Sequence, residues 1–126
     1  MPLEATVQRS RRVMVVDDHP ASGDLLREIL TMEGYAVCVA NCGRDAVAMS
    51  QEFKPQIALL DIGLPDMDGF ALAKQLRAEP HLRDIRLIAL SGYSQPPDSA
   101  SGEDFDYYLV KPVDVDQLLS LLQRLP

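Results

Sequence analysis

Short apolar runs alternate with amphipathic stretches along most of this chain. The runs are four to six residues long, are rich in Val, Ile, Leu or Ala, and cover residues 13–16, 35–40, 57–61, 86–90 and 107–110. Runs of this length and composition, bounded by Gly, Pro or charged residues, are typical of buried parallel strands. The pattern therefore predicts five strands.

The intervals between the runs carry apolar residues at helical spacing. Pro20 suits a first helical turn, and the leucines and isoleucines after it recur on one face until Gly34. Further helices are predicted over residues 45–53, 70–76 and 118–125. Asp114 and Gln117 have the spacing of a capping box before the last one. The chain thus alternates strand and helix, which predicts an α/β fold of parallel βαβ units with helices on both sheet faces.

Length and composition limit the possible functions. The 126 residues suit one domain, and we expect residues 1–10 to be a lead-in and residues 11–126 to form that domain. Nineteen acidic against twelve basic residues give a net charge of −7, which disfavours direct binding of nucleic acid. There is no apolar run of the length that a membrane span or signal peptide requires. We therefore expect a cytoplasmic protein without membrane insertion.

Charged and polar side chains follow the ends of four predicted strands. Asp17 and Asp18 follow the first strand, Asp61 ends the third, Ser91 follows the fourth and Lys111 the fifth. The carboxyl ends of parallel strands meet at one edge of a sheet, where ligands bind. Two carboxylates about 5 Å apart repel by roughly 3 kcal/mol at an effective dielectric near 20, so three of them need compensating cations. Lys111 supplies one, and an all-oxygen ligand set predicts Mg²⁺ as the other.

Mg²⁺ and a lysine beside an aspartate are typical of phosphoryl transfer, and an aspartate can itself accept the group as an acyl phosphate. Four segments, in this order, resemble the signature of response-regulator receiver domains. They are Asp17-Asp18, the stretch LLDIGLPDMDG at 59–69, LSGY at 90–93 and YLVKP at 108–112. The resemblance covers residues 11–125. It implies a flavodoxin-like, doubly wound, five-stranded parallel sheet in the strand order 2-1-3-4-5.

The resemblance also implies a role for each matching residue. Asp61 is then the phosphoacceptor, and Mg²⁺ is bound by Asp18 directly, by Asp17 mainly through water, by Asp61 and by the carbonyl of Gly63. Lys111 bridges the phosphoryl group and the Asp61 carboxylate, next to a cis peptide bond.

Ser91 and Tyr108 form the switch implied by the resemblance. The Ser91 hydroxyl moves toward the phosphoryl group and the Tyr108 ring turns inward, which alters a surface that partners bind, while Gly92 leaves the site open. The implied partners are a histidine kinase or histidine phosphotransfer protein and a downstream protein target. The segments around 91–93 and 111–113 look more like receivers of hybrid histidine kinases than receivers fused to DNA-binding domains. Such a domain assists its own phosphorylation and dephosphorylation and is not an enzyme acting on a separate substrate.

The chain departs from the family pattern between Ser91 and Lys111, where it is about two residues shorter. Residues 94–104 contain no Leu, Ile, Val, Met or Phe, so a helix there would have no apolar stripe. We predict that the fourth helix is short or missing. Gly63 and Tyr93 occupy the positions that gate the hydrolytic water in the family, so Gly63 contributes no side chain to this control and Tyr93 is a candidate shield.

Other interpretations remain open. A degenerate receiver could act as a binding module that needs no phosphorylation. An aspartate-nucleophile phosphatase would need a second acid where Gly63 stands, and no Gly-rich P-loop supports nucleotide hydrolysis. Asp66 and Asp68 are interpreted as turn and cap residues, and His19 as a solvated loop residue.

Overall fold

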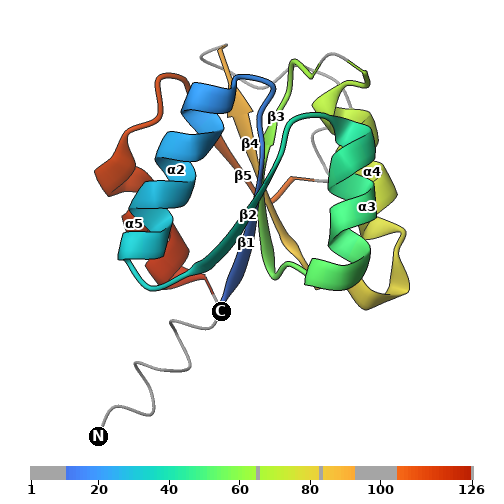
Figure 1. Cartoon of the computed structure of the whole chain (residues 1–126), viewed down its shortest axis with the longest axis horizontal. Helices are drawn as coiled ribbons and strands as arrows, with labels where there is room; N and C mark the ends of the chain where they lie inside the picture. The colour runs from blue at the N-terminus through green and yellow to red at the C-terminus, as the bar shows by residue number, and fades with distance from the viewer. Residues whose placement is uncertain (1–10, 65, 83, 93–104, 126) are drawn as a thin grey trace, which may run out of the picture.

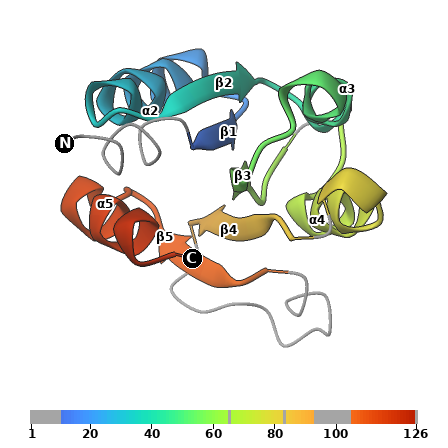
Figure 2. The same ribbon diagram turned by 90° about the horizontal axis from the view of Figure 1, so that it is seen from below.

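In the described part of the chain, the fold is a parallel sheet between two pairs of helices (Figures 1 and 2). The computed structural model describes residues 11–64, 66–82, 84–92 and 105–125. The strands are β1 (Arg12–Val16), β2 (Ala36–Ala40), β3 (Ile57–Asp61), β4 (Arg86–Ser91) and β5 (Tyr107–Val110), and they lie in the order β2-β1-β3-β4-β5. This confirms the predicted flavodoxin-like, doubly wound sheet. The lead-in predicted for residues 1–10 and the shortened helix predicted within residues 94–104 lie outside the described residues.

Two helices cover each face of the sheet within the described part of the chain. The helices are α2 (Pro20–Met32), α3 (Gly43–Phe53), α4 (Gly69–Arg77) and α5 (Val115–Arg124), with a short 3₁₀ turn, η1 (Pro80–Leu82), after α4. Figure 2 shows α2 and α5 on one side of the sheet and α3 and α4 on the other. The helix predicted from residue 45 begins two residues earlier, at Gly43. None of the described helices is long and apolar enough to cross a membrane.

Alternate residues of each strand enter opposite halves of the core. In β3, Ile57 and Leu59 pack with α2 and α5, whereas Ala58 and Leu60 pack with α3 and α4. Every residue of β3 is buried. Fully burying one such aliphatic side chain contributes roughly 1.5–3 kcal/mol. A continuously apolar run therefore suits the centre of this sheet, and it places the polar residue that follows at the sheet edge.

Two of the helices begin at the aspartates that the sequence indicated. The Asp68 side chain accepts a hydrogen bond from the Ala71 amide at 2.6 Å, and that of Asp114 accepts one from the Gln117 amide at 3.1 Å. These bonds satisfy backbone donors that the first turn of a helix leaves without partners. Asp68 is thus confirmed as a cap residue.

Helix α3 is capped from another part of the chain. Cys42, at its N-cap position, makes no side-chain cap bond. Instead, Asp66 accepts hydrogen bonds from the amides of Gly43 at 2.8 Å and Arg44 at 2.9 Å. These backbone bonds hold the pKa of Asp66 below its ordinary value. Asp66 therefore joins the segment after β3 to the start of α3.

Hydrogen bonds of Asp106 hold the chain in position just before β5 begins. Its Oδ2 accepts hydrogen bonds from the Leu87 amide at 2.8 Å and from Nη2 of Arg77 at 2.7 Å, and its amide donates to the Leu87 carbonyl at 2.8 Å. Arg77 also donates to the Ile85 carbonyl at 2.6 Å. This network ties the end of α4 to β4 and β5, and β5 delivers Lys111.

Candidate functional site

The strand register brings the predicted site residues to one pole of the sheet. Asp61 pairs with Leu90 across β3 and β4, and Ser91 pairs with Val110 across β4 and β5. Just beyond the last pair, the Lys111 amide donates to the Ser91 carbonyl at 2.7 Å. On the other side of β3, β1 runs directly into Asp17. Neighbouring parallel strands thus end together, as the sequence predicted.

Asp61 and Lys111 form the centre of this arrangement. The Lys111 Nζ lies 2.9 Å from Oδ2 of Asp61, and the Gly63 amide donates to Oδ1 at 3.0 Å. Asp61 is 6% exposed. Both carboxylate oxygens therefore have a donor, one an ammonium and one a backbone amide, and the carboxylate is held in one orientation. The peptide bond between Lys111 and Pro112 is cis, as expected.

The acidic pair lies beside a histidine. Asp17 is 2% exposed, and its Oδ1 accepts a hydrogen bond from the His19 amide at 2.9 Å. Nδ1 of His19 lies 3.3 Å from Oδ1 of Asp18. The imidazole is 76% exposed, which agrees with the predicted loop position, but the sequence did not indicate its contact with Asp18.

The donor chemistry of this pair suits a hard divalent cation. One ligand atom from each of Asp17, Asp18 and His19 lies within 4.8 Å of the others. Among the described residues, Asp61 is not part of this close group, and its Oδ2 contacts Lys111 instead. Two carboxylates from one loop, with a third on the neighbouring strand, match the few oxygen ligands that Mg²⁺ takes from proteins while keeping several waters.

The two predicted switch residues lie on the neighbouring strands β4 and β5. Ser91 is buried, at 5% exposure. The Tyr108 ring packs against Phe105, with ring centres 5.6 Å apart, and borders the core cluster on the α3 and α4 side. Its hydroxyl is buried and has no hydrogen-bond partner in the described part of the chain. Burial raises the pKa of Tyr108.

Glycines shape the surroundings of Asp61. A Cβ at Gly69 would lie 2.8 Å from the Ile62 Cα and 2.9 Å from the Asp61 carbonyl oxygen, so the chain after β3 can close only over a glycine. A Cβ at Gly63 would meet only Oδ1 of Asp61, at 3.9 Å. One at Gly92 would meet nothing within 4 Å, which agrees with the open position predicted there. Tyr93, the candidate shield, lies outside the described residues.

An apolar groove opens next to the acid pair and was not identified from the sequence. It has a volume of about 530 Å³ and lies between α2 and the segment that follows β5. Asp17, His19 and Lys111 border it, and its apolar lining includes Leu25 and Ile29 of α2. Leu25 is 57% exposed. From its helical spacing, Leu25 was expected to face the core with the other apolar residues of α2. Its exposure in the structure shows that it lies at the surface instead.

Comparison with known protein families gives one match that spans most of the chain. Residues 13–123 match the model of the response regulator receiver domain. The chain is 35% identical over 116 residues to the DNA-binding dual master transcriptional regulator RpaA of Synechocystis sp., covering 90% of this chain and 48% of RpaA. It is 33% identical to Protein PilH of Pseudomonas aeruginosa, covering 88% of this chain and 93% of PilH. The chain thus spans about half of RpaA and nearly all of PilH.

Solved structures of similar proteins agree with this match. A CheY-like receiver domain from Methylobacillus flagellatus superposes with a TM-score of 0.82 at 35% identity, over 90% of this chain and 97% of that one. The response regulator TrrA from Thermotoga maritima, in complex with Mg²⁺ and BeF, gives 0.81 at 31% identity, over 90% and 97%. TrrA bound to the histidine kinase ThkA gives 0.80 at 31% identity, over 90% and 97%.

Proposed function

The chain belongs to the family of response regulator receiver domains of two-component signalling, and on that basis we propose that Asp61 accepts a phosphoryl group from a phosphohistidine. The donor is a histidine kinase or a histidine phosphotransfer protein. The transfer switches a surface that a downstream protein binds. The domain promotes its own phosphorylation and dephosphorylation and works in the cytoplasm.

The contact between Asp61 and Lys111 carries this proposal. An Asp61 oxygen attacks phosphorus, the bond from phosphorus to the donor's imidazole nitrogen breaks, and the neutral imidazole leaves after taking up a proton. An acyl phosphate is formed. The Lys111 ammonium lies 2.9 Å from Oδ2 of Asp61. From this position it can bind the phosphoryl oxygens and stabilise their negative charge. Ser91 ends the neighbouring strand β4, and its hydroxyl is proposed to donate to the same oxygens.

Asp17 and Asp18 are proposed to hold Mg²⁺, together with Asp61 and the Gly63 carbonyl. When bound, Mg²⁺ neutralises carboxylate and phosphoryl charge. Asp17 is nearly fully buried, and its bond from the His19 amide orients its carboxylate. Asp17 and Lys111 border the same groove, and the incoming phosphoryl group is proposed to lie between the acidic pair and the ammonium.

We propose that the phosphohistidine protein docks on the groove beside α2. The groove borders Asp17 and Lys111, and Lys111 contacts Asp61, so a donor protein seated there would bring its imidazole near Asp61. Leu25 is exposed, so a partner seated in the groove would bury its apolar side chain.

The first experiment tests Asp61 as the acceptor. The purified protein is incubated with Mg²⁺ and a small phosphodonor, and intact mass and acid lability are measured beside an Asp61→Asn control. One phosphoryl adduct is expected in the wild-type protein and none in the variant. No adduct at saturating donor, or an adduct that persists in Asp61→Asn, would contradict the proposal and favour a module that binds partners without phosphorylation.

A second experiment tests the docking surface. Leu25→Asp should slow transfer from a phosphohistidine protein by about tenfold or more, which corresponds to about 1.4 kcal/mol of transition-state binding. Its rate with the small phosphodonor should stay unchanged. Met32→Asp is the matched control, because Met32 is 79% exposed on the same helix and does not line the groove. Equal slowing by both variants, or with both donors, would contradict the assigned surface.

A further inference from the structure

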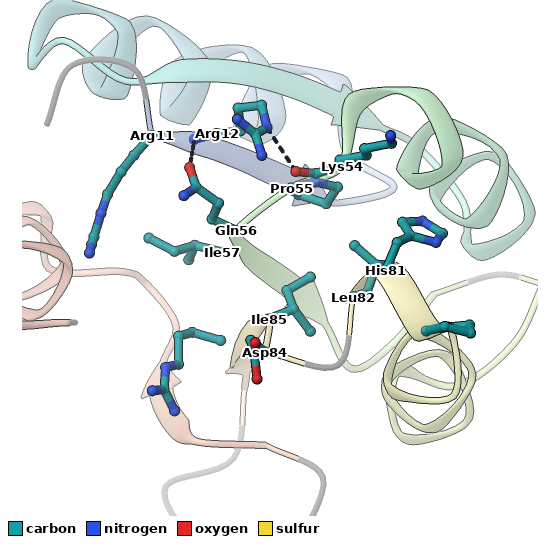
Figure 3. Close-up of a pocket in the computed structure, with 12 residues that line it drawn as sticks. Arg11, Arg12, Lys54, Pro55, Gln56, Ile57, His81, Leu82, Asp84 and Ile85 are labelled. Carbon is teal, nitrogen blue, oxygen red and sulfur yellow. Dashed lines mark hydrogen bonds between the residues drawn. The ribbon is translucent and has the colours of Figure 1, made fainter. Parts of the chain in front are cut away.

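A second cavity lies at the pole of the sheet opposite Asp61. It has a volume of about 360 Å³ and is lined by the starts of β1, β3 and β4 and by the ends of α3 and η1 (Figure 3). The amino ends of parallel strands gather about one strand length, roughly 15 Å, from their carboxyl ends. The cavity therefore shares no residue with the phosphoacceptor site. Its size is within the range of small-molecule pockets, about 300–1,000 Å³.

The lining is cationic although the protein is acidic. Arg11, Arg12, Lys54 and Arg86 line the cavity together with one carboxylate, that of Asp84. The whole chain carries a net charge of −7. A hollow lined by one sign of charge focuses the electric field and attracts ligands of the opposite sign. This cavity is thus suited to an anion.

Hydrogen bonds to the backbone hold Arg12 in position. Its amide donates to Oε1 of Gln56 at 2.9 Å, and its Nε donates to the Lys54 carbonyl at 2.8 Å, as Figure 3 shows. Lys54 has the left-handed φ of 51° that ends α3 and directs the chain toward β3. The Nη atoms of Arg12 and the Lys54 ammonium have no hydrogen bond or ion pair with any residue that the structure describes. Donors whose attachment points are already fixed cost less entropy when they bind a ligand.

The other two arginines, Arg11 and Arg86, differ in how far other residues already bind their guanidinium groups. Arg11 donates to the carbonyls of Leu125 at 2.9 Å and Leu122 at 3.4 Å, so its guanidinium already binds backbone carbonyls at the end of α5. Arg86 has a distant ion pair, with Nη1 3.8 Å from Oδ1 of Asp106. Arg12, Lys54 and Arg86 are therefore the cations that remain to bind a ligand.

Apolar residues complete the cavity. Pro55, Ile57, Leu82 and Ile85 are all buried and form part of its lining. Figure 3 shows Arg12, Lys54 and Gln56 on one side and Ile85 and Asp84 across from them. A ligand that contacts both the cationic and the apolar residues of the cavity needs a strongly anionic group and a flat or apolar remainder.

We propose that this cavity binds a small organic phosphate, with mononucleotides as the model class. The phosphate contacts Arg12, Lys54 and Arg86, since a guanidinium fits phosphate oxygens in pairs. The base lies against Ile57 and Ile85, and Asp84 accepts a hydrogen bond from a sugar hydroxyl.

The test is a titration of the ¹⁵N-labelled full chain with AMP in EDTA, followed by amide NMR shifts. Saturable shifts are expected at Arg12, Gln56, Ile57 and Arg86 and not at Gly63. Arg12→Gln and Lys54→Gln should each weaken binding about tenfold, as expected for the loss of a charge-assisted hydrogen bond. Arg27→Gln is the matched control, because the Arg27 side chain is exposed on α2 and pairs only with Asp24 among the described residues. Amide spectra of each variant verify folding.

Each of the following results would overturn the proposal. No saturable shift up to about 10 mM AMP, where even millimolar affinity approaches saturation, would exclude the site. Equal shifts with inorganic phosphate alone would exclude a role for the apolar lining. Unchanged affinity in Arg12→Gln and Lys54→Gln, or shifts confined to Gly63 and its neighbours, would place the ligand elsewhere. Binding should persist in Asp61→Asn, so the result is independent of the proposed phosphorylation.

Discussion

Replacing Lys111 with methionine should destabilise the domain through Asp61. The substitution keeps an unbranched side chain of similar length and removes the ammonium that lies 2.9 Å from Oδ2 of Asp61. Asp61 is 6% exposed, so the carboxylate that remains is poorly hydrated. Among the described residues, Lys111 is the cation in direct contact with Asp61.

The expected magnitude follows from the burial of the pair. Removing one partner of a fully buried ion pair costs about 3–5 kcal/mol. The Lys111 side chain is 32% exposed, so hydration reduces its share of the interaction, and we expect a loss of about 2 kcal/mol of unfolding free energy. Asp61→Asn should be neutral or stabilising, because it removes charge repulsion and keeps an acceptor for the Gly63 amide. The double variant should be about as stable as Asp61→Asn.

The assay is urea denaturation of the wild type, both single variants and the double variant at pH 7 in EDTA. A double-mutant cycle then isolates the coupling between the two side chains, which we expect to be about 2 kcal/mol. If the two single effects add within about 0.5 kcal/mol, the ion pair does not stabilise the site and our electrostatic reasoning is wrong. A changed m-value would instead signal an altered unfolded or native state.

Five further substitutions, one of them a control, test other parts of the structure. Mg²⁺ should raise the urea midpoint of the wild type and much less that of Asp18→Asn; an equal rise in both would remove Asp18 from the metal site. Asp66→Asn should be less stable than the wild type at pH 7, and the difference should disappear in acid, because a carboxylate with a lowered folded pKa contributes stability above its unfolded pKa, about 3.9, and loses it as pH falls through the folded value. A difference independent of pH would contradict the capping role. Gly69→Ala should cost about 1–3 kcal/mol by thermal or urea unfolding and slow phosphorylation, because its Cβ meets backbone, whereas Gly92→Ala should change neither. Tyr108→Phe should leave stability unchanged or raise it by up to about 1 kcal/mol, and a clear loss would reveal a partner for the hydroxyl.

The sequence predicted the features that depend on neighbours along the chain. A buried run such as 57–61 indicates a strand wherever it lies, because a strand covered on both faces needs apolar residues at every position. Asp68 and Asp114 could be interpreted as caps because each bonds an amide three residues away. The meeting of Asp61, Ser91 and Lys111 at one pole also followed, since parallel strands share a direction and neighbouring strands end together.

Only the tertiary structure determined contacts between segments that no local pattern links. Asp66 caps a helix that begins 23 residues earlier, and nothing in the sequence distinguishes it from a turn residue. Arg11 reaches the Leu125 carbonyl, 114 residues away, and no pattern at the start of the domain predicted this contact. The exposure of Leu25 and the cationic cavity at Arg12 and Lys54 likewise arise from how separate elements pack. Spacing along the chain determines which face of an element a residue occupies, whereas its partners depend on which other elements cover that face.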